Sequence, residues 1–63
     1  MWNYLYEFVD EEWNEHCGER IFVQCNTEEE ADEILGRYFW GDKVCLLGKY
    51  TDEEAEKMGY DTY

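Results

Sequence analysis

The chain has 63 residues, with 17 Asp or Glu against five Lys or Arg, and its formal net charge is −12. We expect one small domain, 1–63, because this length leaves no room for a second. No apolar stretch approaches the ~20 residues that a membrane-spanning helix needs, and we expect no secretory signal. A surface this acidic is repelled by nucleic-acid phosphates and anionic lipids, so we expect neither as a direct ligand.

The aromatic content argues that this charged chain folds. Hydrophobic residues make up 44% of it and aromatic residues 19%, and each large ring buries roughly 150–250 Å². The three cysteines, Cys17, Cys25 and Cys45, are an odd number without a recognisable signal segment. This cysteine usage is typical of a reducing compartment, so we expect a cytoplasmic protein.

The first predicted element is a strand over residues 2–9. Its aromatic residues alternate onto one face: Trp2, Tyr4, Tyr6 and Phe8. Leu5 and Val9 fall on the other face. Residues 10–18 allow two interpretations, a short helix that stops at Gly18 or a wide turn between strands.

A second strand is predicted over residues 20–25, followed by the clearest helix signal. Thr27 precedes Glu30 by three residues, which is a capping-box pattern, with Asn26 as the alternative cap. The apolar residues of this helix recur at helical spacing: Ala31, Ile34, Leu35, Tyr38 and Phe39. Residues 41–42, Gly-Asp, are predicted to end the helix.

A third strand over residues 43–50 leads into a second helix at about 52–58. Thr51 and Glu54 repeat the capping-box pattern, and Gly59 suits the position after the helix. The tail, 60–63, is either frayed or held by its tyrosines. The order predicts an α+β domain, with a three-stranded, mainly antiparallel sheet and two helices on one face.

Catalytic patterns are missing, and we expect no enzyme. The chain has no Ser, which excludes a serine nucleophile. Cys17 stands beside His16, but adjacent side chains rarely point at one another. The neighbouring Glu15 and Glu19 disfavour a thiolate.

Metal and cofactor patterns are missing as well. Four residues are possible zinc ligands: His16, Cys17, Cys25 and Cys45. They form no CxxC pair, which structural zinc sites usually contain. The acidic runs 10–12 and 52–54 lack the spaced loop and turn glycine of a calcium site, and no glycine-rich phosphate loop is present. We therefore expect neither a metal nor a cofactor.

The acidic residues gather in three blocks. The net charge is −6 over residues 1–19, −5 over 27–33 and −4 over 51–63. Two of these blocks open predicted helices, where carboxylates complement the helix dipole. A solvated face that keeps the protein soluble is the simplest interpretation, but ~2–8 net charges suffice for that in a small domain. The excess favours a surface that binds a basic partner.

Rows of carboxylates can imitate the phosphates of DNA. Duplex DNA carries one negative charge per roughly 1.7 Å of axis, and the proteins that bind it carry matching Lys and Arg residues. Acids at i, i+3 and i+4 of a helix lie about 5–6 Å apart, near the spacing of successive phosphates. The candidate partner-binding residues are Asp10, Glu11, Glu12, Glu15, Glu28, Glu29, Asp32, Glu33, Asp52, Glu53 and Glu56.

In size, charge, single-domain α+β character and cysteine usage, the chain resembles the small acidic inhibitors carried by phages, anti-CRISPR proteins and other DNA mimics among them. The resemblance is one of overall character, and no family residue is carried over from it. It implies a non-enzymatic inhibitor that blocks access of target DNA or guide RNA to a nuclease complex. If phage-encoded, such a protein acts in the cytoplasm of the host cell.

An alternative hypothesis uses the aromatic sheet face. Both predicted faces carry large apolar groups, since Phe22 falls opposite Ile21 and Val23. If the helices cover one face, the other is expected to be partly exposed and to bind a protein partner or a second copy. The competing interpretation is that the rings simply fill a core that a short chain could not otherwise complete.

Overall fold

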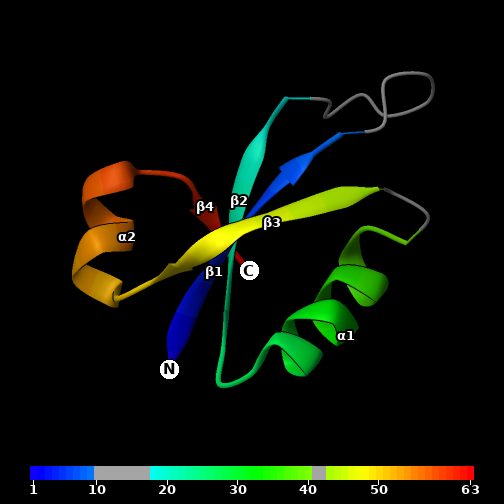
Figure 1. Cartoon of the computed structure of the whole chain (residues 1–63), viewed down its shortest axis with the longest axis horizontal. Coiled ribbons are helices and arrows are strands. Elements are labelled where there is room, and N and C mark those ends of the chain that lie inside the picture. Colours follow the sequence, from blue (N-terminus) through cyan, green and yellow to red (C-terminus); the bar gives the residue numbers. More distant parts are fainter. Residues whose placement is uncertain (10–17, 41–42) are drawn as a thin grey trace.

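The computed structural model describes residues 1–9, 18–40 and 43–63. Four strands and two helices follow one another along the chain (Figure 1): β1 (Trp2–Phe8), β2 (Arg20–Cys25), α1 (Glu28–Tyr38), β3 (Val44–Tyr50), α2 (Asp52–Met58) and β4 (Asp61–Thr62). The alternative of a helix or a turn over 10–18 falls almost wholly outside the described residues.

The strands form one mixed sheet in the order β3-β1-β2-β4. β1 is antiparallel to both β2 and β3, whereas β4 is parallel to β2. The prediction of three strands is therefore wrong in number. β4 has only two residues, too few to show the alternating pattern that identifies a strand in a sequence. Backbone hydrogen bonds of Tyr63 with Phe22 (2.8 Å) and Gln24 (2.9 Å) hold it against β2.

The helix α1 covers one face of the sheet. Tyr4 and Val23 are paired across β1 and β2, so their side chains lie on the same face of the sheet. Ala31 and Leu35 of α1 pack against this face. The buried residues of this cluster are Tyr4, Tyr6, Phe8, Ile21, Val23, Cys25, Ala31 and Leu35. Phe39 meets Phe8 edge to face, with ring centroids 5.0 Å apart.

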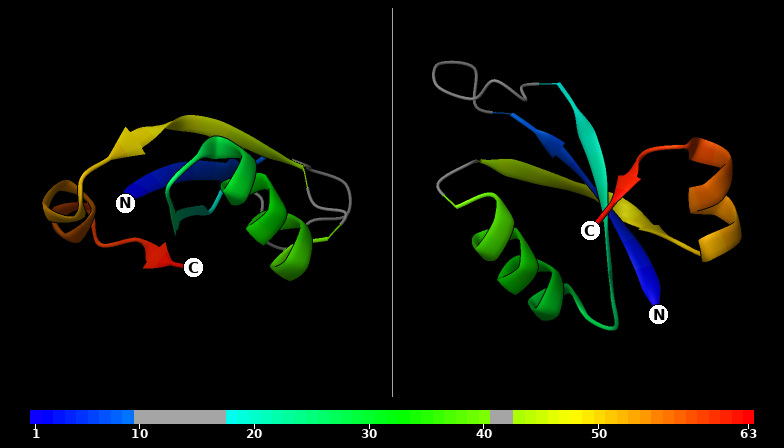
Figure 2. Two further views of the ribbon diagram at one scale, coloured as in Figure 1. Left: turned by 90° about the horizontal axis from the view of Figure 1, so that it is seen from below. Right: turned by 180° about the vertical axis from the view of Figure 1, so that it is seen from behind.

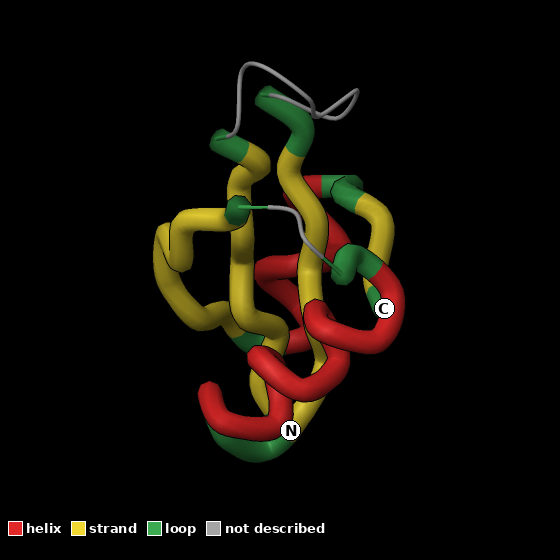
Figure 3. The backbone as a smooth tube through the Cα atoms, turned by 90° about the vertical axis from the view of Figure 1, so that its right-hand side faces the viewer, coloured by secondary structure: helices red, strands yellow, loops and turns green. Residues whose placement is uncertain are grey.

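The helix α2 covers the opposite face, where Ala55 packs on Leu5 and Phe22. Figures 1 and 3 show the two helices on either side of the strands. The prediction of both helices on one face is wrong, because the central strands are apolar on both faces and each face needs its own cover. Phe22 is fully buried, beneath the rings of Tyr50 and Tyr60.

Both predicted helix caps are confirmed. The Thr27 hydroxyl accepts from the Glu30 backbone N–H at 3.2 Å. Thr51 and Glu54 form the complete reciprocal box. At the end of α2, Gly59 adopts a φ of 76°, a left-handed conformation that glycine reaches at little cost. In the described ranges, neither helix has the length and apolar character needed to cross a membrane.

Candidate functional site: an acidic end of the sheet

Both helices begin at the same end of the sheet. β2 and β3 run antiparallel to β1, so both finish where β1 starts, and each passes at once into a capped helix. Figures 1 and 2 show the starts of α1 and α2 at the end that also holds the N-terminus. Sheet topology thus places at one end of the sheet two acidic blocks that are separated in sequence.

The first turns of the two helices define this acidic end. Its residues are all exposed carboxylates: Glu28, Glu29, Glu30, Asp52, Glu53 and Glu54. Negative side chains in a first turn lie next to the positive end of the helix dipole, which offsets part of their mutual repulsion. The fold can therefore concentrate charge at this end at less cost than elsewhere.

Most described cations lie away from the acidic end. Arg37 and Lys57 occupy the last turns of their helices and lie 3.9 Å from Glu33 and Glu53. Both pairs are highly exposed, so each contributes only ~0–1 kcal/mol. The described cations thus neutralise the acidic end only weakly.

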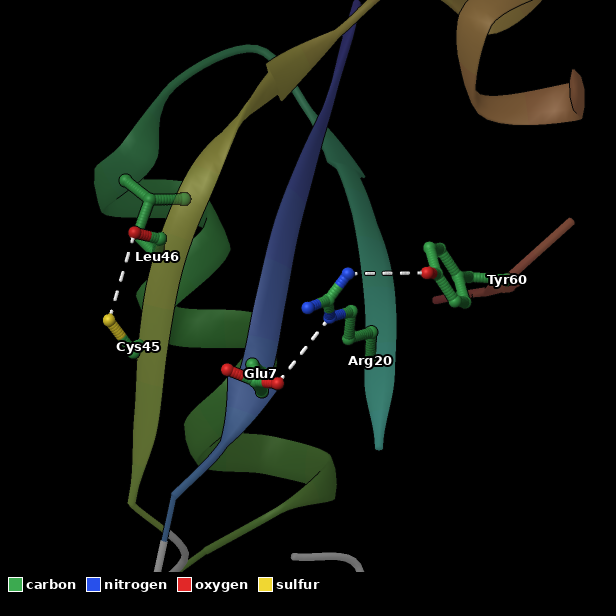
Figure 4. Close-up of polar contacts among 5 residues, drawn as sticks. All are labelled: Glu7, Arg20, Cys45, Leu46 and Tyr60. Atoms are coloured by element: carbon green, nitrogen blue, oxygen red, sulfur yellow. Dashed lines mark hydrogen bonds and ion pairs between the residues drawn. The ribbon is translucent and has the colours of Figure 1, made fainter. Parts of the chain in front are cut away.

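Arg20 marks the other end of the described sheet. It starts β2, lies 3.4 Å from the Glu7 carboxylate and donates to the Tyr60 hydroxyl at 3.4 Å. Figure 4 shows Arg20 between these two partners, which come from β1 and from the segment before β4. Arg20 therefore ties the C-terminal segment to the central strands and neutralises Glu7 locally.

Two of the six carboxylates serve as caps. Glu54 accepts from the Thr51 backbone N–H at 3.3 Å, as the box requires. Glu30 instead accepts from the backbone N–H of Asn26, also at 3.3 Å. Their side chains are turned back onto the helix starts, so they are less suited than their neighbours to reach a partner.

Asp52 has a structural role that its sequence position did not reveal. Its carboxylate accepts from the side-chain amides of Asn3 (2.7 Å) and Gln24 (3.1 Å). These bonds, chiefly the one from Asn3, lower the pKa of Asp52 below its ordinary value. Asn3, which sequence reasoning missed, is the buried polar residue of β1.

The remaining predicted acids divide according to their contacts. Glu28, Glu29, Asp32 and Glu56 make no hydrogen bond or ion pair with any described residue and are exposed. Asp32 and Glu56 lie one turn beyond the first turns of their helices. Four further candidates fall outside the described residues: Asp10, Glu11, Glu12 and Glu15.

A shallow hollow of about 440 Å³ lies beside Asp52, between the sheet and α2. Asn3, Gln24 and Asp52 line one side of it, and their polar groups bond to one another. Across the described ranges, no three His, Cys, Asp or Glu side chains converge as metal ligands would. The hollow thus offers a recess in the surface, with its polar groups already engaged.

The sheet faces do not provide the partly exposed aromatic surface that the alternative hypothesis requires. Tyr4, Tyr6 and Phe8 are buried under α1, and Phe22 is buried under α2. That expectation is wrong, because the second helix covers the second face. Trp2, at the rim, is partly exposed and holds the Lys49 ammonium 4.5 Å from its ring centre.

Comparison of the chain with models of protein families, with curated proteins and with solved structures found no match.

Proposed function

We propose that this chain is a non-enzymatic acidic inhibitor that binds the basic groove of a nucleic-acid-binding protein or nuclease complex. The observation that carries the proposal is that two acidic helix starts lie at one end of the sheet, on its opposite faces. The partner-binding residues are the exposed acids that no described contact engages, Glu28, Glu29 and Asp32 on α1 and Glu56 on α2.

The spacing of these acids suits a groove built for phosphates. Glu28 and Asp32 are four residues apart on α1, which places such side chains about 5–6 Å from each other. Glu56 extends the pattern to the second helix. A basic groove that follows DNA, with one charge per roughly 1.7 Å of axis, would meet several of them together.

The cost of the net charge to folding also supports a functional role for the acidic residues. Twelve net negative charges on 63 residues oppose folding by self-repulsion. The two helix starts hold six acids where dipoles and caps tolerate them, so the negative charge there is kept at reduced cost. Such a charge accelerates association with an oppositely charged partner and favours it over wrong partners.

The partner class follows from the resemblance to small acidic phage inhibitors. We propose a guide-loaded CRISPR nuclease as the first target, with the chain acting in the cytoplasm, that of the host cell if phage-encoded. The chain would compete with target DNA or guide RNA for the same cationic channel. It would bind stoichiometrically and would itself contact no nucleic acid.

The test uses a purified nuclease loaded with guide RNA and a fluorescent duplex carrying the target. The inhibition constant is measured for the wild-type chain and for a triple variant, Glu28→Gln, Glu29→Gln and Asp32→Asn. A second triple variant removes the same charge at the far end of the sheet: Glu7→Gln, Glu19→Gln and Asp61→Asn. Circular dichroism checks that both variants fold.

The wild-type chain is expected to release the duplex, and the α1 variant to be weaker by between about ten- and a hundredfold. This range corresponds to three charge pairs of ~0.5–1 kcal/mol each. The far-end variant should lose little. Equal losses in the two variants would mean that total charge matters and the acidic end does not.

A further inference from the structure

The strand β3 is the long open edge of the described sheet. The order β3-β1-β2-β4 leaves β3 and β4 at the edges, and β4 has two residues where β3 has seven. Natural edge strands are usually kept short, charged, bulged or covered, because an open edge pairs with other chains. The centre of β3, residues 44–48, carries no charge.

The outer side of β3 has backbone groups that pair with no described strand, although the Leu46 carbonyl accepts a long contact, 3.9 Å, from the Cys45 thiol. The Lys43 carbonyl faces β1, where it accepts from the Val9 N–H at 3.1 Å. Alternation along an antiparallel strand then turns the N–H and C=O groups of Val44 and Leu46 away from β1. Within the described ranges, no further strand lies on that side.

The side chains of this edge are apolar and accessible. Leu46 is 36% exposed and Leu47 42%, and Cys45 is exposed as well. Figure 4 shows Cys45 and Leu46 on β3, separated from Arg20 by β1. Leu47 is the extra residue at a bulge, since the register passes from Leu46 to Gly48 opposite Tyr6 and Leu5.

The charges around β3 are ordered along the strand. Residues 43–51 contain no acid, and Lys43 precedes the strand; Asp42, next to Lys43 in the sequence, lies outside the described residues. The three acids that begin α2, residues 52–54, follow it. Neither Lys43 nor Lys49 makes an ion pair with a described carboxylate, unlike Arg20, Arg37 and Lys57. A second chain of charge −12 would be repelled by most other surfaces.

We infer that β3 pairs antiparallel with β3 of a second copy, about a twofold axis close to Leu46 and Leu47. In such an antiparallel pair, Val44 at the start of β3 in one copy lies near Tyr50 at the end of β3 in the other copy. Lys43 of each copy then comes beside the acidic start of α2 in the other copy. The sheet continues through both copies, and the exposed leucines pack at its centre.

A second copy fits this edge better than an unrelated extended segment. The twofold axis repeats the approach of Lys43 to the α2 acids, so one arrangement offsets part of the acidic charge at both ends of the interface. An unrelated segment would need an acid at each end and apolar residues between them. The inference does not rest on the proposed inhibitory function, although the interface shares the α2 part of the acidic end, residues 52–54.

Sedimentation equilibrium of the whole chain tests the inference over a range of concentrations and at low and high salt. The expected species has twice the 7.7 kDa of one chain. Leu47→Glu should give a monomer, whereas Met58→Glu should not. Met58 is a matched control because it is also 42% exposed but lies on α2. Higher salt should strengthen the dimer by screening the net repulsion, whereas it should weaken binding to a basic partner.

Cysteine cross-linking checks the position of the axis. Leu46→Cys and Leu47→Cys are placed singly in a chain that also carries Cys17→Ser and Cys45→Ser, with Met58→Cys as the control. Residues paired across antiparallel strands have Cα atoms about 4.5–5.5 Å apart, which a disulfide can span. At least one of the two leucine positions should give a cross-linked dimer on mild oxidation, and the control should not.

Two results would overturn the inference. The first is a wild-type chain that stays monomeric at every concentration and salt, which would leave the edge to an extended segment of a different protein. The second is a Leu47→Glu variant that dimerises as the wild type does, which would place the interface elsewhere.

Discussion

The side-chain amide of Asn3 donates a 2.7 Å hydrogen bond to the Asp52 carboxylate, across 49 residues of sequence. Asn3 is 2% exposed and is the one fully buried polar residue in the described ranges. Gln24 donates to the same carboxylate oxygen. One acid of the acidic end therefore joins β1, β2 and the start of α2, and is a structural residue rather than a free contact for a partner.

Replacing this carboxylate should destabilise the fold. Asp52→Ala leaves the buried Asn3 amide without its shortest acceptor, so the free energy of unfolding in urea should fall. Glu53→Ala is the matched control, because it removes the same charge from the same helix turn without touching Asn3. Loss of stability in the control but not in Asp52→Ala would contradict the assigned role.

The same contact gives an acid-dependent signature. The pKa of Asp52 is lowered in the folded state, so its contribution to stability is present above the ordinary value of 3.8. That contribution is lost as pH falls through the lowered pKa, because both states then bind the proton. Below pH 3.8, the stability difference between the wild-type chain and Asp52→Ala should narrow.

Tyr6 presents the opposite case, a buried hydroxyl without a hydrogen-bond partner among the described residues. Burial, with help from nearby Asp32 and Glu28, raises its pKa to about 12. Tyr6→Phe should leave the free energy of unfolding unchanged or raise it, since an unpartnered buried polar group costs about 1–3 kcal/mol. Tyr38→Phe, at an exposed site, is the control.

Alkaline unfolding reports the ionisation of Tyr6. A pKa above the unfolded value of 10.0 means that the folded state holds the proton longer, so stability falls as pH rises from 10 to about 12. Tyr6→Phe should lose less stability over this interval than the wild-type chain, and Tyr38→Phe should follow the wild type. Identical curves for Tyr6→Phe and the wild type would exclude this assignment.

The cap of α2 should contribute measurably to stability. Thr51→Ala removes the hydroxyl that accepts from Glu54, and the usual loss for such a cap is about 0.5–2 kcal/mol. Thr51→Ser keeps the acceptor and should restore most of the stability, as measured by urea unfolding. If Ser and Ala at this position are equally destabilising, the methyl group matters more than the hydrogen bond.

Local chemistry made much of the fold predictable. The strand 20–25 and the helix 52–58 have the bounds that their sequence patterns predicted, because caps and alternation are local signals. The fourth strand and the placement of α2 were not predictable in this way. Both depend on contacts between distant parts of the chain, because Phe22, on the face that α2 covers, packs against Ala55 and Tyr60.

The candidate site was predictable only in part. Acid runs after Thr27 and Thr51 identified both helix starts, but their common position follows from strand direction, which no single run contains. The structural role of Asp52 was hidden for a similar reason, because its partner Asn3 lies in a strand with no other buried polar residue. The acidic helix starts were therefore predictable from the sequence, but their position at one end of the sheet was not.

The most direct test of the acidic end is the salt dependence of its binding. The dissociation constant for a guide-loaded nuclease is measured from low to high salt, for the wild-type chain and for the variant with Glu28→Gln, Glu29→Gln and Asp32→Asn. Wild-type binding should weaken steeply with salt, and the variant should bind more weakly with a shallower slope. Tight wild-type binding with the same slope as the variant would contradict the account.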